Sequence, residues 1–156
     1  MKLDVGSEAP DFTVKDAEGV SVTLSEFRGK FVVLYFYPRA DTPGCTREAC
    51  AFRDNLPHFE GINAVILGVS ADTEADQAKF ARKYDLPFRL LADTEHGIAD
   101  GYGAWVEKNN YGKKYMGIQR MTYIIAPDGK VAKVFPKVSV DGHAEEVLAA
   151  LGQLSG

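Results

Sequence analysis

The chain contains two cysteines, Cys45 and Cys50, in a segment whose residue order favours thiol chemistry. The apolar segment 31–37 comes first, a turn with Pro43 and Gly44 follows, and Cys45 then opens a helix-forming stretch. A helix N-terminus stabilises an anion through its unpaired N–H groups and its dipole, and the thiolate is the nucleophilic form of cysteine. The segment therefore predicts a nucleophile at Cys45, and a buried structural thiol is the alternative.

The cysteine count gives little support to a structural disulfide or a metal site. A cysteine pair in a cytosolic protein is redox-active, metal-binding or incidental. Structural zinc takes four ligands, and an iron–sulfur motif needs further cysteines, which this chain lacks. The three histidines, His58, His96 and His143, fall on different expected elements without ligand spacing. We expect no metal ion, and we expect the histidines to be solvated or to cap helices.

Length, composition and charge are those of an ordinary globular domain. The 156 residues are 46% hydrophobic and 26% charged, with a net charge of −4 at neutral pH. This balance lacks the basic patch of a nucleic-acid binder, and the longest apolar run is far shorter than the roughly 20 residues that cross a bilayer. Residues 1–6 show no apolar signal segment. We therefore expect one cytoplasmic domain over residues 1–156.

The hydrophobic pattern predicts a three-layer α/β domain around a mixed sheet. Residues 12–16 and 20–24 are expected to form a small hairpin, and 31–37 a central strand buried on both faces. Strands at 63–70 and 88–91 alternate with helices, which implies a parallel core. The remaining expected elements are helices at 46–57 and 73–84, a brief helix near Ile98, a hairpin at 122–135 that adds antiparallel strands, and a final helix burying Ala144, Val147, Leu148 and Leu151.

Residues 101–119 are rich in Gly, Asn and Lys and are expected to form a polar loop. Its lysines are expected to make a solvated face: Lys108, Lys113 and Lys114. Its aromatic side chains are expected to anchor the loop rather than to contact a substrate: Trp105, Tyr111 and Tyr115. The loop leads into Arg120, which precedes the strand expected from residue 121.

Several motifs resemble the peroxiredoxin family. The pattern Pro38-x-x-x-Thr42-x-x-Cys45, placed after a buried strand and opening a helix, matches the active-site motif of that family. The longer run Asp-Thr-Pro-Gly-Cys-Thr at 41–46 resembles its bacterioferritin comigratory protein branch, also called peroxiredoxin Q. The run Tyr-Gly-Lys-Lys-Tyr-Met-Gly-Ile-Gln-Arg at 111–120 is similar to the same branch.

The opening motif Gly-x-x-Ala-Pro-Asp-Phe at 6–12 also resembles this branch, and the similarity extends from about Val5 to the final helix. The resemblance implies a thioredoxin-like fold in which the N-terminal hairpin extends the central sheet domain. It also implies a peroxide-reducing activity that needs no metal, flavin or other cofactor.

The resemblance assigns expected roles residue by residue. Cys45 matches the peroxidatic cysteine, and Thr42 and Arg120 match its polar partners. Pro38 matches the proline that shields the thiol. Cys50 matches the resolving cysteine of many members, which implies a Cys45–Cys50 disulfide during the cycle, although a helical cysteine here also fits a packing role.

The chemistry of these side chains supports the roles independently. The Arg120 guanidinium is always protonated, and the Thr42 hydroxyl can accept from a thiol or donate to a peroxide oxygen. With backbone N–H groups of the Gly44 turn, these donors can stabilise charge on the departing oxygen. Glu48, one helical turn from Cys45, is expected to hold Arg120 by an ion pair, and Gly44 and Glu48 are expected to line the substrate site. A surface charge at Arg120 and a helix cap at Thr42 are the alternatives.

These roles predict a thiol-specific peroxidase. The Cys45 thiolate attacks hydrogen peroxide or an organic hydroperoxide, Cys50 condenses with the sulfenic acid, and thioredoxin or a similar dithiol reduces the disulfide. A general thiol–disulfide oxidoreductase and a redox sensor that uses the same disulfide are alternatives, although the thioredoxin Cys-x-x-Cys motif is absent. The resemblance also implies a monomer.

The spacing of the cysteines adds a structural expectation. Helical positions five apart lie about 9 Å between Cα atoms and face directions about 140° apart. A disulfide spans at most about 7 Å between Cα atoms. We therefore expect the first turns of the helix to unwind on oxidation.

Overall fold

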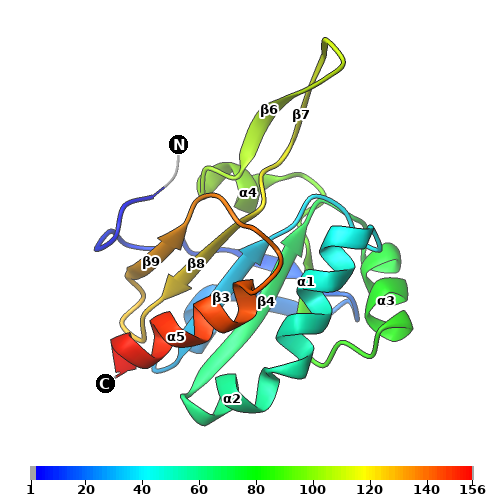
Figure 1. Ribbon diagram of the computed structural model, residues 1–156. Coiled ribbons are helices and arrows are strands. Elements are labelled where there is room, and N and C mark those ends of the chain that lie inside the picture. Colours follow the sequence, from blue (N-terminus) through cyan, green and yellow to red (C-terminus); the bar gives the residue numbers. More distant parts are fainter. Residues whose placement is uncertain (1–2, 156) are drawn as a thin grey trace.

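The computed structural model describes residues 3–155, so residues 1, 2 and 156 of the expected domain lie outside the described part. Its centre is a five-stranded sheet with the strand order β5-β4-β3-β8-β9 (Figure 1). The first three strands are parallel, and β8 runs antiparallel to both β3 and β9. The bounds are β3 (Phe31–Phe36), β4 (Ala64–Ser70), β5 (Arg89–Ala92), β8 (Met121–Ile125) and β9 (Val131–Phe135). The predicted mixed sheet with a parallel core is confirmed.

Strand β3 is central and buried on both faces, as its unbroken apolar sequence predicts. Successive side chains of a strand point to opposite faces. Val32, Leu34 and Phe36 pack into the core on one face of the sheet, whereas Val33 and Tyr35 pack into the core on the other. Packing on both faces holds β3 in place. The start of the loop that follows β3 is therefore held in place as well.

The elements that cover the two faces divide between the two cores (Figure 1). One core includes side chains of α1 (Pro43–Asp54), α2 (Leu56–Gly61), α3 (Glu74–Lys83) and α5 (His143–Ser155). The other includes side chains of β1 (Thr13–Lys15), β2 (Ser21–Thr23), the 3-10 helix η1 (Leu24–Phe27) and α4 (Gly97–Gly101). The expected N-terminal hairpin is therefore present as β1 and β2. No helix within residues 3–155 is long and apolar enough to cross a membrane.

Helix α1 begins earlier than the expected start at residue 46. Pro43 occupies the first helical position, where its fixed φ fits and its missing N–H costs no hydrogen bond. The helix ends at Asp54, and α2 starts at Leu56. The earlier start places Cys45 inside the first turn of α1.

Residues 105–118 form a β-hairpin rather than the expected loop. Strand β6 (Trp105–Asn110) pairs antiparallel with β7 (Lys113–Ile118). Tyr111 and Gly112 form the connecting turn with φ values of 53° and 83°, and two positive φ values suit a two-residue hairpin turn. The hairpin projects from the domain (Figure 1). Its strands therefore lack a buried face, and their sequences lack the alternation of apolar and polar residues that would predict a strand.

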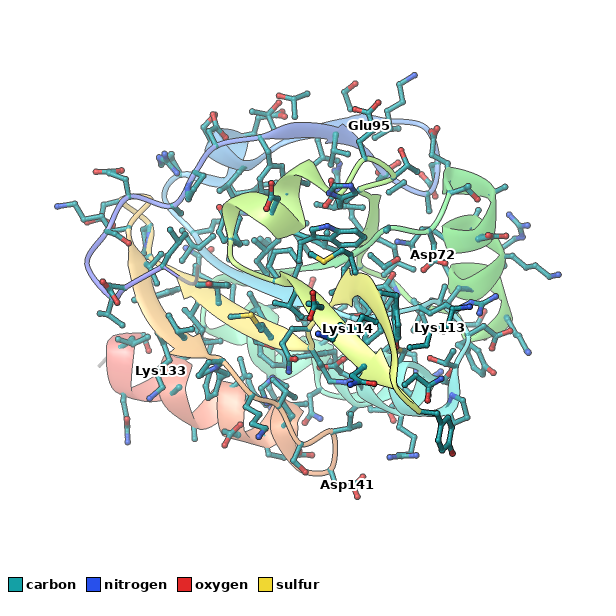
Figure 2. The ribbon with its side chains drawn as sticks, turned by 90° about the horizontal axis from the view of Figure 1, so that it is seen from above. Asp72, Glu95, Lys113, Lys114, Lys133 and Asp141 are labelled. Atoms are coloured by element: carbon teal, nitrogen blue, oxygen red, sulfur yellow. The ribbon has the colours of Figure 1, made fainter. Side chains whose placement is uncertain are left out.

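The aromatic side chains of this hairpin behave differently from one another. Trp105 packs against the core and stacks on His96, with ring centroids 4.0 Å apart. Tyr111 is fully exposed and Tyr115 is half exposed, so the expectation that they anchor the segment is wrong. Figure 2 looks down on this end of the molecule, where Lys113 and Lys114 extend from the hairpin. The base of the hairpin is therefore fixed while its tip stands in solvent.

Candidate active site

Helix α1 places the Cys45 thiol at the positive end of the helix dipole. Thr42 is the N-cap residue and Pro43 is the first helical residue, so Cys45 is the third. Backbone N–H groups in this first turn have no intrahelical partner and favour a negative charge. The thiol forms no disulfide, and Cys45 is only 1% exposed. The predicted position of Cys45 at a helix N-terminus is confirmed.

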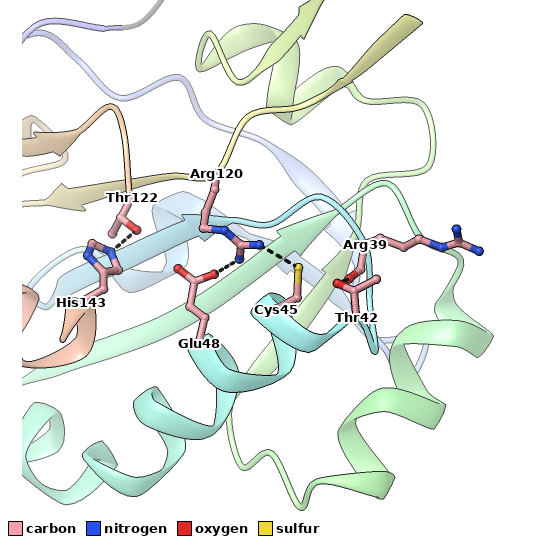
Figure 3. Close-up of polar contacts among 7 residues, drawn as sticks. All are labelled: Arg39, Thr42, Cys45, Glu48, Arg120, Thr122 and His143. Carbon is pink, nitrogen blue, oxygen red and sulfur yellow. Dashed lines mark hydrogen bonds and ion pairs between the residues drawn. The ribbon is translucent and has the colours of Figure 1, made fainter. Parts of the chain in front are cut away.

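Arg120, which follows β7, reaches the same thiol (Figure 3). Its Nη2 donates to Cys45 Sγ at 3.3 Å, and its Nη1 donates to Glu48 Oε1 at 2.6 Å. Glu48 lies on α1 and is 1% exposed. One guanidinium therefore joins the thiol and the carboxyl group, and the expected Glu48–Arg120 ion pair is present.

The Glu48 carboxyl group is only partly ionised near neutral pH. Burial, the largest influence, raises its pKa to about 7, whereas the charge and the hydrogen bond of Arg120 lower it. Its Oε2 has no hydrogen-bond partner among residues 3–155. The loss of water around this oxygen is therefore not offset by a hydrogen bond, which disfavours the charged form. Arg120 is thus paired with a carboxyl group that holds its negative charge less readily than an exposed glutamate does.

Gly44 provides room for this guanidinium. A Cβ atom at Gly44 would lie 3.3 Å from Arg120 Nη2, a contact tighter than most Cβ contacts. A side chain here would press on the group that donates to Cys45. Gly44 thus lies beside Arg120 and Cys45, and the closeness of the guanidinium gives a steric reason for a residue without a side chain.

Thr42 and Pro38 lie in or next to the loop that precedes α1. The Thr42 hydroxyl donates to the Arg39 carbonyl oxygen at 2.8 Å (Figure 3) and makes no side-chain capping bond to the helix. Within the described part of the chain, no hydrogen bond joins Thr42 to Cys45. Pro38 is half-buried at the start of the loop. The structure therefore brings Cys45, Glu48 and Arg120 into contact, and the Thr42 hydroxyl bonds to the loop instead.

Cys50 lies further along the same helix, half-buried and unpaired. Helix α1 is continuous from Pro43 to Asp54, so it is intact between the two cysteines. Its geometry separates their Cα atoms by about 9 Å, beyond the reach of a disulfide. The two thiols cannot bond unless α1 changes.

His143 is buried rather than solvated, contrary to expectation. Its Nε2 shares a 2.8 Å hydrogen bond with Thr122 Oγ1 (Figure 3), and its Nδ1 lies 2.9 Å from Glu146 Oε1. Burial lowers the pKa of His143, although the bond to Glu146 opposes this effect. The contact holds the start of α5 against β8, two residues beyond Arg120. A threonine within an apolar strand was the only sequence signal for this pair.

The loop before α1 is tied to other elements. Asp41, with a φ of 60°, accepts hydrogen bonds from Lys83 Nζ and Tyr84 Oη, each at 2.9 Å. The Ala40 N–H donates to Asp72 Oδ2 at 2.7 Å. These contacts fix the chain immediately upstream of the thiol. No group of three or more His, Cys, Asp or Glu side chains between residues 3 and 155 is placed to hold a metal ion.

The sheet and the thiol site together place this chain among the thioredoxin-like proteins. Within that class it belongs to the AhpC/TSA family, whose model matches residues 5–134. It is 46% identical over 155 residues to peroxiredoxin Bcp of Bacillus subtilis (strain 168), covering 99% of each chain. It is 40% identical over 146 residues to peroxiredoxin Bcp of Escherichia coli (strain K12), covering 94% of each.

Solved structures agree with this membership. The bacterioferritin comigratory protein of Xanthomonas campestris, studied for its alkyl peroxide reduction activity, superposes with a TM-score of 0.93 at 37% identity, covering 98% of this chain and 100% of the other. A cysteine variant of PrxQ from Xylella fastidiosa gives a TM-score of 0.95 at 32% identity, covering 100% and 99%. The predicted family, branch and fold are confirmed.

Proposed function

We propose that this protein is a thiol peroxidase that reduces hydrogen peroxide and organic hydroperoxides to water and alcohols. The observation that carries the proposal is the 3.3 Å contact of Arg120 Nη2 with Cys45 Sγ in the first turn of α1. A fixed cation and a helix N-terminus both favour the thiolate. The peroxiredoxin names of the relatives and the alkyl peroxide reduction of the Xanthomonas protein support the same activity.

The first step is a displacement at oxygen. The Cys45 thiolate attacks the terminal peroxide oxygen, an S–O bond forms and the O–O bond breaks with its electron pair on the other oxygen. That oxygen takes up a proton and leaves as water or an alcohol, while the thiol becomes a sulfenic acid. Arg120 and the free N–H groups of α1 face the charge as it develops, which lowers the barrier.

The second and third steps return the enzyme to its thiol form. The Cys50 thiol attacks the sulfenic sulfur of Cys45, which forms a disulfide and releases water. Thioredoxin or a similar dithiol then reduces that disulfide by exchange. The other predicted site residues shape the substrate side of the thiol: Pro38, Thr42, Gly44 and Glu48.

The proposed setting follows from the same chemistry. We place the protein in the cytoplasm, where cellular dithiols keep both cysteines reduced between turnovers. We also propose that residues 1–156 act as one monomeric domain without a cofactor. The two cores that enclose the sheet within a single chain support this arrangement.

The direct test of the activity is stopped-flow mixing of fully reduced protein with hydrogen peroxide, and separately with an organic hydroperoxide. We expect a second-order rate orders of magnitude above that of a free thiol. A rate no faster than a free thiol toward either peroxide would contradict the proposed function and favour disulfide exchange or sensing.

Oxidation is expected to unwind the first turns of α1. A Cys45–Cys50 disulfide needs Cα atoms closer than an intact helix allows. Amide hydrogen exchange should therefore speed up for residues 46–51 in the oxidised protein, while α5 keeps its protection as an internal control. Equal protection of 46–51 in both redox states would contradict the predicted unwinding.

A further inference from the structure

A closed ring of hydrogen bonds holds the loop that joins β3 to α1. Tyr37, which follows β3 directly, donates through its hydroxyl to Gln77 Oε1 on α3. Gln77 Nε2 donates to Ser70 Oγ at 2.8 Å, and the Ser70 hydroxyl donates to Asp72 Oδ2 at 2.6 Å. The same Asp72 oxygen accepts the Ala40 N–H at 2.7 Å. Because Ala40 is three residues after Tyr37, the ring begins and ends at the same loop.

The direction of each hydrogen bond in the ring is determined. Burial raises the pKa of Tyr37 above its ordinary range, so the phenol stays protonated and donates. Gln77 Oε1 is then the acceptor, which leaves Nε2 to donate to Ser70 and, at 3.0 Å, to the Leu91 carbonyl oxygen. Tyr37, Ser70 and Gln77 are at most 1% exposed, so water does not replace these partners.

Asp72 connects the buried part of the ring to the loop. It lies between the end of β4 and the start of α3 (Figure 2), and it is half-buried. The Ser70 hydroxyl and the Ala40 N–H both donate to its Oδ2, whereas its Oδ1 makes no hydrogen bond with any group of residues 3–155. The ring therefore orients the carboxylate, and the carboxylate in turn holds Ala40.

The residue after Ala40 explains why the chain must be held here. Asp41 has a φ of 60°, in the left-handed region that residues other than glycine rarely adopt. Such a conformation persists only where surrounding contacts hold it. Two donors bind the Asp41 side chain, and Asp72 binds the preceding N–H of Ala40. After this turn the chain reaches Thr42, the N-cap of α1, and then Cys45.

We propose that Asp72 is a positioning residue that sets the loop between β3 and α1 for the reaction of Cys45 with a peroxide. It acts through the Ala40 N–H and does not touch the thiol. The proposal rests on the proposed function, because this loop carries Pro38 and Thr42 on the substrate side of the thiol. The rest of the ring holds Asp72 from the core, so the packing of β3, β4 and α3 fixes the geometry of the site.

The test follows the single-turnover reaction with hydrogen peroxide by stopped flow, well below the unfolding temperature. Full-length protein carrying Cys50→Ser is the parent, so that one thiol reacts. Asp72→Ala removes the acceptor of the Ala40 N–H and is expected to slow the reaction about tenfold, since a displacement of about 1 Å can cost about 10²-fold. The pH at which the rate rises should stay the same, because the contacts of the thiol with Arg120 and α1 are unchanged.

Two further variants separate the position of the acceptor from its charge. Asp72→Asn loses the charge, but its amide oxygen can accept both donors while its NH₂ group takes the place of Oδ1. It should retain most of the parent rate. Asp72→Glu keeps the charge but moves the oxygens by one methylene group, so it should slow the reaction. Asp76→Ala is the matched control, because Asp76 is exposed beside the same surface hollow as Asp72. It should react at the parent rate.

The outcomes that would overturn the proposal are specific. A lower unfolding temperature for Asp72→Ala with an unchanged rate would show a purely structural role. A full rate for Asp72→Glu with a slow Asp72→Asn would assign the effect to charge, and an equal loss in Asp76→Ala would make it non-specific. A parent protein that reacts no faster than a free thiol would instead contradict the proposed function. A fast parent with an equally fast Asp72→Ala would overturn the role of Asp72 alone.

Discussion

Replacing Cys45 by serine is expected to reduce peroxide consumption to the level of buffer alone. A hydroxyl remains protonated where a thiol ionises, so the variant lacks the anion that attacks the O–O bond. Serine is close in size to cysteine, and the site is 1% exposed, so the helix and the Glu48–Arg120 pair should persist. Stopped-flow mixing with hydrogen peroxide measures the loss, and circular dichroism confirms that the variant is folded.

Cys50→Ser is the matched control for this variant, because it removes the other thiol of the same helix. It should consume one peroxide per protein at nearly the wild-type rate and then stop, because the sulfenic acid at Cys45 lacks its resolving partner. Peroxide consumption that survives Cys45→Ser but disappears in Cys50→Ser would assign the nucleophile to Cys50 and overturn the proposed roles.

Arg120→Met is expected to slow the reaction by a factor on the order of 10²–10³, the usual effect of removing one preorganised donor. The variant loses the hydrogen bond to Cys45 Sγ and the charge that faces the departing oxygen. Loss of the Arg120 charge should raise the pKa of Glu48 above its value of about 7, so the carboxyl group becomes neutral and its burial remains tolerable. Stopped-flow rates, with thermal unfolding as a check on the fold, measure this effect.

Arg120→Lys separates charge from geometry in the same assay. Lysine keeps the positive charge but cannot donate to the thiol and to Glu48 as one planar fork. We expect a rate between those of wild type and Arg120→Met. A rate for Arg120→Met within a few-fold of wild type would mean that the helix N-terminus alone activates the thiol.

The central sheet could be predicted because burial leaves a direct mark on sequence. Strand β3 touches apolar cores on both faces, so each of its positions must be apolar. The contact of Arg120 with Cys45 spans 75 positions, and no local period connects them. The motifs that resemble a known family identified that pair, and burial then explained the partial protonation of Glu48.

The β6–β7 hairpin and the partial burial of Lys108 against it could not be predicted from the sequence. The hairpin leaves the domain, so its strands lack the alternating apolar face that indicates a strand. The burial of Lys108 depends on the absence of a side chain at Gly117, which lies diagonally opposite in the paired strand. Such a relation exists only once the register of two strands is known.

The contacts of Asp41 determine which end of α1 can move when the helix opens. Lys83 and Tyr84 donate hydrogen bonds to Asp41, just upstream of Cys45, so the N-terminal end of α1 is constrained. In the proposed cycle, we therefore expect the residues between the cysteines, rather than the loop at Asp41, to rearrange as the sulfurs approach. We expect the helix to re-form from this end after reduction, so that restoring the thiol site requires only the rewinding of a short helical turn.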